Sequence, residues 1–437
     1  MSKTETEIAQ TVAEATAALD FTPLAAGDRR WVDFAPGRGE DAMVHLRRML
    51  ERNVPGRFRR VAFVSHRGAG KTTELNRLMA ALEGRYRCLY LQANTELDAN
   101  RFTVEDLLLV LARELEKLAR EELAEPISPK LLGSIENWFA TQVVSHAVGQ
   151  EYVGEVRTEA KAEGGIPFFA RLMGKVTALC KTESTHREKV ENELRKYPGT
   201  LTESVNGLLD AVGKTLAKAG KELLVVIDNL DRYNPEVVDG LLVENADRLK
   251  ELRVHLVVTP PISLVYRPIS QSIDALFATT FLPTVRLRSQ GDSYDTVGEP
   301  GKSVLLSALG KRIDLEVLLP DKAARDRLLF ASGGAIRELL QLAQEATLEV
   351  DEGPLGLAVV DRVLQKRRQR LRDRVDTNGW WDTVVHIAKT KRLDRDPACQ
   401  QLLYQRLVFQ YNGEGWYDIH PLLSEVPEFQ SLLKRTT

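Results

Sequence analysis

Hydrophobic residues gather in five short runs in the middle of the chain, and segments with helical spacing separate these runs. Continuous apolar runs bounded by turns are typical of strands that are buried on both faces of a parallel sheet. The pattern therefore predicts an α/β fold built on a parallel sheet. The five predicted strands are 60–65, 87–92, 222–228, 254–259 and 281–287.

Apolar residues that recur every three or four positions predict helices through most of the remaining chain. Residues 302–372 are almost entirely helical in pattern, with one break at Gly333-Gly334. The stretch 125–200 is charged, mostly helical and too long for an ordinary connection between two strands, so we expect it to be an insert that contacts a partner. Further helices are expected at 40–52, 73–82, 102–123, 201–219 and 235–249.

Two apolar runs near the C-terminus, 407–411 and 416–419, flank the dipeptide Asn412-Gly413. Asn-Gly between such runs is a strong signal for a β-hairpin. Short helices precede the hairpin, and this order predicts a winged-helix-like module. The basic cluster 366–372 lies on the neighbouring helix and predicts either a DNA contact or a solvated helix face, of which we favour the second.

The overall charge is balanced, with 60 Lys and Arg against 62 Asp and Glu and a formal net charge of −2. This excludes a global basic field that would draw the molecule onto DNA, so any contact with nucleic acid must come from a local patch. The cysteines Cys88, Cys180 and Cys399 are too far apart for a CxxC pair or a compact zinc site. This usage, with neither a signal peptide nor an apolar run of about eighteen residues, predicts a cytoplasmic protein without membrane contact.

The first predicted strand runs into a glycine-rich turn, Ser65-His-Arg-Gly-Ala-Gly-Lys-Thr72, and then into a helix. The turn fits the phosphate-loop pattern GxxxxGK[ST] except that serine replaces the first glycine. Lys71 is expected to neutralise the β- and γ-phosphates of ATP, and the Thr72 hydroxyl to hold Mg²⁺. The residues predicted to bind the nucleotide are Ser65, Arg67, Gly68, Ala69, Gly70, Lys71, Thr72 and Thr73.

The alternative interpretation of this turn is a tight strand–helix connection that carries Gly-Lys-Thr by chance. The flanking strand and helix argue against that alternative, because they are the context that the motif requires. A second Gly-Lys-Ser, at 301–303, lacks a preceding strand and is expected to be a loop that enters a helix.

Carboxylates stand at the end of the third predicted strand, in Asp228-Asn-Leu-Asp231. Ligands of open α/β sheets bind outside the carboxyl ends of the strands, so Asp228 is expected to face the Mg²⁺ held by Thr72. Its alternative role is a helix cap. Thr259, at the end of the fourth strand, is either a γ-phosphate sensor or a strand-end cap. Arg337, after the Gly-Gly break, can reach the phosphates from a lid or remain solvated.

Together these segments resemble the AAA+/STAND class of P-loop ATPases, above all those of bacterial conflict and signalling systems. The resemblance rests on Arg67-Gly-Ala-Gly-Lys-Thr-Thr-Glu-Leu75, Asp-Asn-Leu-Asp-Arg232, Thr259 and Gly-Gly-x-x-Arg337-Glu-Leu, and it covers residues 20–437. It implies a sheet order of 5-1-4-3-2, a helical lid, and ATP bound between the two. It also implies that Lys71 and Thr72 are Walker A residues, Asp228 the Walker B acid, Thr259 sensor 1 and Arg337 sensor 2.

The resemblance also shows where this sequence departs from its relatives. Fast ATPases of this class carry glutamate where Asn229 stands, so Asp231 is the candidate substitute and slow hydrolysis is expected. The class often forms rings in which an arginine from a neighbour completes the site. The candidates for that arginine are Arg267, Arg286, Arg288 and Arg312.

The resemblance divides the chain into four predicted parts. These are an N-terminal helical lead-in with an adenine-side linker (1–59), a P-loop ATPase core with its insert (60–290), a helical lid (291–372) and a winged-helix-like domain (373–437).

The prediction for function is a slow, Mg²⁺-dependent ATPase that acts as a switch, forms homo-oligomers and controls a separate effector protein in bacterial defence or signalling. One alternative is a DNA-binding AAA+ ATPase of the initiator or transposition type, which binding that falls steeply with salt would support. The other alternative is a scaffold that holds nucleotide without hydrolysing it.

Overall fold

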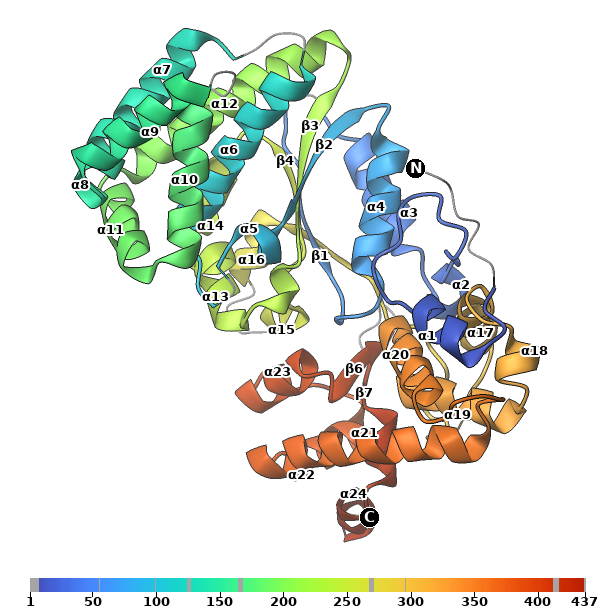
Figure 1. The fold of residues 1–437 in the computed structure, drawn as a ribbon. Helices are drawn as coiled ribbons and strands as arrows, with labels where there is room; N and C mark the ends of the chain where they lie inside the picture. Colours follow the sequence, from blue (N-terminus) through green and yellow to red (C-terminus); the bar gives the residue numbers. More distant parts are fainter. Residues whose placement is uncertain are drawn as a thin grey trace.

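The structure is a computed structural model. It describes residues 8–54, 56–98, 100–123, 127–163, 168–266, 271–294, 296–411 and 416–435. Its centre is a five-stranded parallel sheet in the order β2-β3-β4-β1-β5, which is the predicted order 5-1-4-3-2 counted from the other edge (Figure 1). The strands are β1 (Arg60–Val64), β2 (Tyr86–Gln92), β3 (Glu222–Asp228), β4 (His255–Val258) and β5 (Ala278–Phe281).

Alternate residues of the strands enter two different hydrophobic clusters, which confirms that the sheet is covered on both faces. Val61 and Phe63 of β1 pack with α3 (Ala42–Glu51) and α4 (Lys71–Leu82) on one face. Ala62 and Val64 belong to the larger cluster on the other face, which contains α6 (Val104–Glu122) and α12 (Pro198–Lys218). Figure 1 shows the two pairs of helices on opposite sides of the strands.

The fifth strand lies a few residues before the position predicted for it. β5 is Ala278–Phe281 and pairs with β1 from Val61↔Ala278 to Val64↔Phe281, so the prediction of 281–287 was wrong. Pro283 has no N–H to donate to a ladder, and the chain leaves the sheet there. The more polar Ala-Thr-Thr-Phe run is tolerated because β5 is an edge strand with one neighbour.

The predicted insert is a helical subdomain packed against α6 and α12, away from the carboxyl end of β1 (Figure 1). Its elements are α7 (Pro129–Trp138), the π-helix η1 (Phe139–Val144), α8 (Ser145–Ala147), α9 (Gln150–Glu163), α10 (Phe168–Thr182) and α11 (Ser184–Arg195). The predicted break at 164–167 lies outside the described residues.

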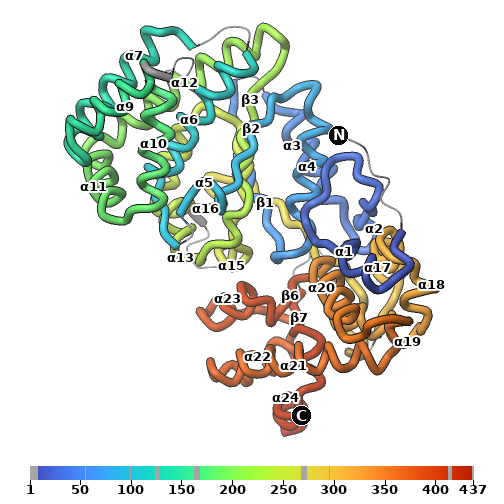
Figure 2. Tube along the Cα trace, viewed as in Figure 1, coloured from blue at the N-terminus to red at the C-terminus, as the bar shows by residue number. Residues whose placement is uncertain are grey.

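Shorter elements lie between the strands and near the N-terminus. Figure 2 shows the N-terminal segment running beside helices of the C-terminal half. These elements are α1 (Val12–Ala18), α2 (Ala35–Arg38), α5 (Ala93–Glu96), η2 (Leu230–Arg232), α13 (Pro235–Asp239), η3 (Gly240–Glu244), α14 (Ala246–Glu251), α15 (Ile262–Val265) and α16 (Gln271–Leu276).

The C-terminal third is helical apart from one antiparallel hairpin, β6 (Val408–Tyr411) and β7 (Trp416–Ile419). The hairpin confirms the predicted pair of strands, while its turn at 412–415 lies outside the described residues. Helix α21 runs through residue 372, where the predicted lid ends. The helices are α17 (Gly301–Gly310), α18 (Leu315–Leu318), α19 (Lys322–Ser332), α20 (Ile336–Thr347), α21 (Leu357–Asn378), α22 (Trp381–Thr390), α23 (Pro397–Tyr404), the 3₁₀ helix η5 (Pro421–Glu425) and α24 (Pro427–Arg435).

Within the described ranges, no helix combines the length and the apolar character needed to cross a bilayer.

The Gly333-Gly334 break joins α19 to α20 at a point where the backbones touch. A Cβ atom on Gly334 would lie 1.8 Å from the carbonyl oxygen of Val285, and the residue has φ +84°. We expect Gly334→Ala to lower the free energy of unfolding by about 2–5 kcal/mol, from left-handed strain and overpacking together.

Urea denaturation followed by circular dichroism measures this loss. Gly353 is the matched control, because it has φ +88° but open space around its Cβ position. Gly353→Ala is expected to cost only the strain, about 1–2 kcal/mol. Equal losses for the two variants would contradict the steric argument.

Candidate functional site

The glycine-rich turn between β1 and α4 has the backbone shape of a phosphate-binding loop. Gly68 and Gly70 have φ +87° and +97°, which side chains other than glycine rarely adopt. A Cβ on Gly68 would also lie 2.8 Å from the Cβ of Arg337. Glycine therefore lets the start of α20 approach the loop, where the Arg337 N–H donates to the Gly68 carbonyl at 3.1 Å.

Lys71, the first residue of α4, is buried beneath this loop. Its ammonium donates to the hydroxyl of Ser65 at 2.9 Å and forms an ion pair with the Asp231 carboxylate at 2.6 Å. Asp231 is itself buried in the 3₁₀ turn η2. A phosphate bound by Lys71 therefore has to share this ammonium with Asp231 or displace the carboxylate.

The carboxylate of Asp228, at the end of β3, accepts four hydrogen bonds, and the residue is 1% exposed. The hydroxyls of Thr72, Thr259 and Tyr90 donate to it at 2.7, 3.0 and 2.8 Å. The fourth donor is the Asn229 N–H at 2.7 Å. The predicted pair of Thr72 and Asp228 is thus brought together, and their oxygens are the hard ligands that Mg²⁺ prefers.

Two features of this cluster were not predicted from the sequence. Tyr90 comes from β2, and the register Gln92↔Asp228 carries its hydroxyl to the acidic strand end; burial and the Asp228 carboxylate raise the pKa of the phenol. Asn229 has φ +66°, a conformation that asparagine tolerates better than glutamate does. The missing glutamate therefore has a local conformational reason.

Thr259 is fully buried and donates its hydroxyl to Asp228. In the described structure it orients this carboxylate and does not line the cavity beside the loop.

That cavity encloses about 870 Å³, including its open mouth. Its walls come from the segment 21–34, the phosphate loop, the end of β3, and helices α17 and α20. The segment 21–34 is held on α4, since the Leu24 N–H donates to the Thr73 hydroxyl at 3.0 Å. The apolar lining side chains are Phe21, Pro23, Leu24, Trp31, Val32, Phe34, Ala308, Ile336 and Leu340, and the cationic ones are Arg30, Arg67, Lys71, Arg232, Arg312 and Arg337.

Two of the four candidates for the arginine that a neighbouring subunit would supply make contacts within their own chain. Arg312 lines the cavity and donates to the Ala308 carbonyl at 2.8 Å, and burial lowers its pKa to about 10. Arg288 is buried and pairs with Asp418 at 2.5 Å. Arg267 lies outside the described residues, and Arg286 is half-buried.

The phosphate loop also contacts the C-terminal hairpin. The Nε2 atom of His66 accepts a hydrogen bond from the Gln410 N–H of β6 at 2.8 Å, and its ring meets Phe409 edge-on. Burial and the charge of Lys71 lower the pKa of His66 to about 3, so the ring is neutral at pH 7. No local signal in the sequence marks a partner that lies 344 positions away.

Arg67, the next residue, makes a second contact with the C-terminal part. Its guanidinium donates from Nε to the Asp231 carbonyl at 2.6 Å and lies 4.1 Å above the ring of Tyr404 in α23. The loop predicted to bind phosphate is therefore in direct contact with both the end of β3 and the C-terminal module.

The basic cluster on α21 is largely neutralised by carboxylates, which fits a paired helix face better than a free DNA-binding surface. Arg367 pairs with the buried Glu338 of α20. The other pairs are Lys366–Glu349 at 2.6 Å, Arg368–Glu425 at 2.8 Å and Arg372–Glu428.

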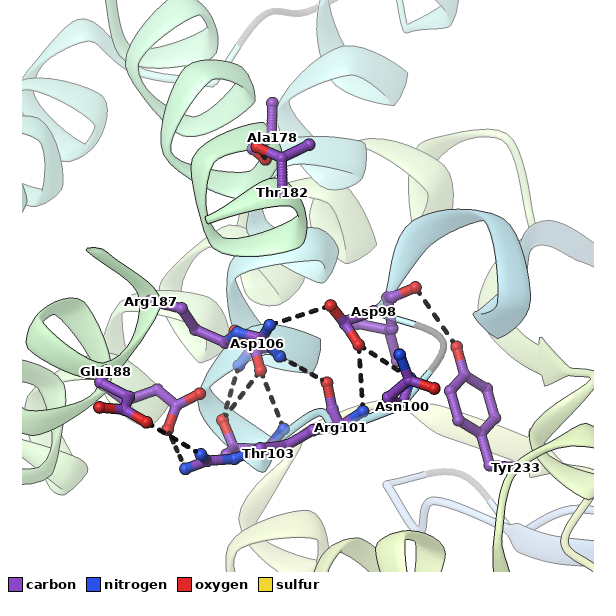
Figure 3. A network of polar contacts seen from close by, with 12 residues as sticks. Asp98, Asn100, Arg101, Thr103, Asp106, Ala178, Thr182, Arg187, Glu188 and Tyr233 are labelled. Carbon is purple, nitrogen blue, oxygen red and sulfur yellow. Dashed lines mark hydrogen bonds and ion pairs between the residues drawn. The ribbon is translucent and has the colours of Figure 1, made fainter. Parts of the chain in front are cut away.

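A polar network joins the segment after β2 to the insert (Figure 3). Arg187 of α11 pairs with Asp98 at 2.9 Å and donates to the Arg101 carbonyl at 2.9 Å. Tyr233, two positions after Asp231, donates its hydroxyl to the Ala93 carbonyl at 2.8 Å. The end of β3 and the insert are thus attached to the same short segment.

No group of three or more His, Cys, Asp or Glu side chains within the described residues is placed to hold a metal by itself. A magnesium ion at Thr72 and Asp228 would therefore take its remaining ligands from the nucleotide and from water, as this ion commonly does.

Residues 68–245 match the family profile described as the KAP family P-loop domain. None of the curated proteins matches the sequence. Among solved structures, the Walker-type ATPase PABY2304 of Pyrococcus abyssi has 13% identity and a TM-score of 0.46, with 93% of this chain and 99% of that chain covered.

The Aeropyrum pernix ORC1 protein, solved in complex with DNA, has 14% identity and a TM-score of 0.40, with coverages of 96% and 98%. The Cdc6p protein of Pyrobaculum aerophilum has 12% identity and a TM-score of 0.40, with coverages of 98% and 100%. Similarity at this level supports no inference about ligand or partner. The parallel sheet, the loop and the match over residues 68–245 together give this chain the fold of a P-loop NTPase, with a region similar to the KAP family P-loop domain.

Proposed function

We propose that this protein is a Mg²⁺-dependent ATPase that turns over slowly and works as a nucleotide-controlled switch of AAA+/STAND type. The observation that carries the proposal is the convergence of Lys71, Thr72, Asp228 and Arg337 around one cavity with a cationic end and an apolar end. A nucleoside triphosphate has this division between charged and aromatic parts, and pockets of this kind suit such ligands.

Each part of the cavity has a role in this proposal. The loop N–H groups and Lys71 bind the β- and γ-phosphates, and the N-terminus of α4 adds its dipole. Thr72 and Asp228 hold Mg²⁺, which neutralises charge on the phosphate oxygens. The apolar residues of segment 21–34 receive the base, and Arg337 reaches the phosphates from α20.

Slow hydrolysis follows from two residues in the turn after Asp228, namely Asn229 and Asp231. Asn229 cannot accept a proton from water, and Asp231 is engaged by Lys71 at 2.6 Å. An attacking water can use Asp231 only after phosphate has taken Lys71 from this carboxylate. Nucleotide binding and the arrangement of the end of β3 are thereby linked.

The contacts of His66 and Arg67 support the switching part of the proposal. Triphosphate binding reshapes the loop that carries both residues, and both touch the C-terminal module. We expect Mg²⁺ and the slowly hydrolysed analogue ATPγS to change amide exchange in β6 by about tenfold, the effect of about 1.4 kcal/mol in local stability. Hydrogen–deuterium exchange with mass spectrometry measures this change.

His66→Ala removes the acceptor of the Gln410 N–H and is expected to abolish most of the nucleotide-dependent change. His45→Ala on the exposed side of α3 is the control and keeps the full change. Identical exchange of β6 with and without nucleotide in the wild-type chain would contradict the switch.

The partner in this proposal is a separate effector protein, contacted by the helical insert or by the winged-helix-like module, with homo-oligomers as the working form. Its support is the resemblance of the motifs to bacterial defence and signalling ATPases, and the network that ties the insert to the segment beside the site.

A further inference from the structure

Arg232 directly follows the buried Asp231 and ends the 3₁₀ turn Leu230–Arg232 after β3. Its side chain lines the cavity. The side chain is exposed, and none of the hydrogen bonds or ion pairs in the described structure involves its guanidinium. It is therefore an exposed cation at the rim of the proposed phosphate site.

Cationic groups outnumber the available carboxylates at this end of the cavity. Arg67 and Arg337 line it together with Arg232, and repulsion from Arg232 and Arg67 adds to burial in lowering the pKa of Arg337. Asp231 is taken by Lys71, and Asp228 by hydroxyl and amide donors. None of these three guanidinium groups is paired with a carboxylate in the described structure, although Arg67 donates to the Asp231 carbonyl. Such a group of cations favours a multiply charged anion, above all a phosphate.

We propose that Arg232 is a catalytic residue of this site and acts on the γ-phosphate of ATP within its own chain. The inference rests on the ATPase activity proposed above and adds that one chain contains a complete hydrolytic site. An arginine from a neighbouring subunit is not required. The internal engagement of Arg288 and Arg312, two of the candidates for such a neighbour's arginine, agrees with this.

In the hydrolysis step, the Arg232 guanidinium stabilises the charge on the γ-phosphoryl oxygens. The oxygen of a water molecule forms a bond to the γ-phosphorus while the bond from that phosphorus to the β,γ-bridging oxygen breaks. The electron pair of the broken bond stays on ADP, and the proton of the water passes to Asp231 and from there to the released phosphate. Arg232 donates N–H groups to the γ-phosphoryl oxygens, whose charge it stabilises as the bond breaks.

Phosphate release in single and multiple turnovers tests the proposal. Arg232→Ala is expected to lower kcat by at least about 100-fold and to leave the affinity for Mg·ATP within about fivefold, since the guanidinium acts mainly in the transition state. Arg232→Lys should recover only part of kcat, because a single ammonium replaces a planar fork. The exposed Arg395, outside the cavity, is the control, and Arg395→Ala should behave as wild type.

The concentration dependence separates action within one chain from action between chains. Specific activity of the wild type should stay constant over a hundredfold dilution, and an inactive Lys71→Ala chain added in excess should not raise the turnover of Arg232→Ala. Recovery of activity on mixing, or unchanged kcat in Arg232→Ala, would overturn the inference while leaving the ATPase assignment intact. A wild-type chain that binds ATP in calorimetry but releases no phosphate would overturn the hydrolytic assignment and the inference together.

Discussion

Lys71→Ala is expected to reduce ATP hydrolysis to background and to weaken nucleotide binding at least about 100-fold. The ammonium is buried under the loop and lies between the Ser65 hydroxyl and the Asp231 carboxylate. A charge-assisted bond to phosphate in such a buried site contributes about 2–3 kcal/mol or more to binding. Phosphate release and calorimetric titration with Mg·ATP measure the two effects.

The chain supplies its own control for this substitution. Lys302 stands in the second Gly-Lys-Ser sequence, at the start of α17, where it pairs with Asp326 at 2.5 Å. Lys302→Ala should retain wild-type binding and turnover, because no strand precedes this motif. Equal loss in both variants would point to a general effect of removing a lysine and would contradict the assignment.

Lys71→Ala also leaves the buried Asp231 carboxylate without its partner, which typically costs about 3–5 kcal/mol of stability. The double variant Lys71→Ala/Asp231→Asn removes that unpaired charge and is expected to recover most of the stability. Its turnover should stay at background. Turnover that returned together with stability would show that Lys71 serves the fold and not the phosphate.

Asp228→Asn is expected to remove Mg²⁺-dependent turnover, by a factor of about 100 to 1,000, while leaving nucleotide binding without metal largely intact. The amide keeps the size of the side chain but supplies one neutral oxygen for the hydroxyls of Thr72, Tyr90 and Thr259. Hydrolysis measured against Mg²⁺ concentration, with ATP binding in EDTA, separates metal binding from nucleotide binding.

Asp247→Asn, on the exposed side of α14, serves as the control and should behave as wild type. A Mg²⁺ dependence in Asp228→Asn that matched the wild type would contradict the assignment of this carboxylate to the metal.

Most strands could be predicted because their residues report locally on burial, whereas the sheet order came only from the resemblance to a known class of ATPases. β3 and β1 are unbroken apolar runs that end at chemically distinct residues, Asp228 and the glycine loop. β5 was misplaced because Ala278–Phe281 is more polar than the run that follows it, and only pairing with β1 selects it. The hydrophobicity of a segment does not indicate which of its residues pair with the neighbouring strand.

The site residues also fall into two groups: those that local motifs predict and those whose roles depend on contacts between distant parts of the chain. Lys71, Thr72 and Asp228 follow from motifs at the ends of two strands, and the parallel sheet brings them together. The contributions of Tyr90, His66 and Arg67 depend on partners from other strands or from the C-terminal module. Such long-range contacts leave no spacing pattern in the sequence.

The central claim is that the cavity beside the loop binds the triphosphate of ATP, and isothermal titration calorimetry of the purified chain with Mg·ATP tests it most directly. The account predicts saturable binding at one site per chain that is lost in Lys71→Ala and kept in Lys302→Ala. Failure of the wild-type chain to take up either ATP or ADP would contradict it.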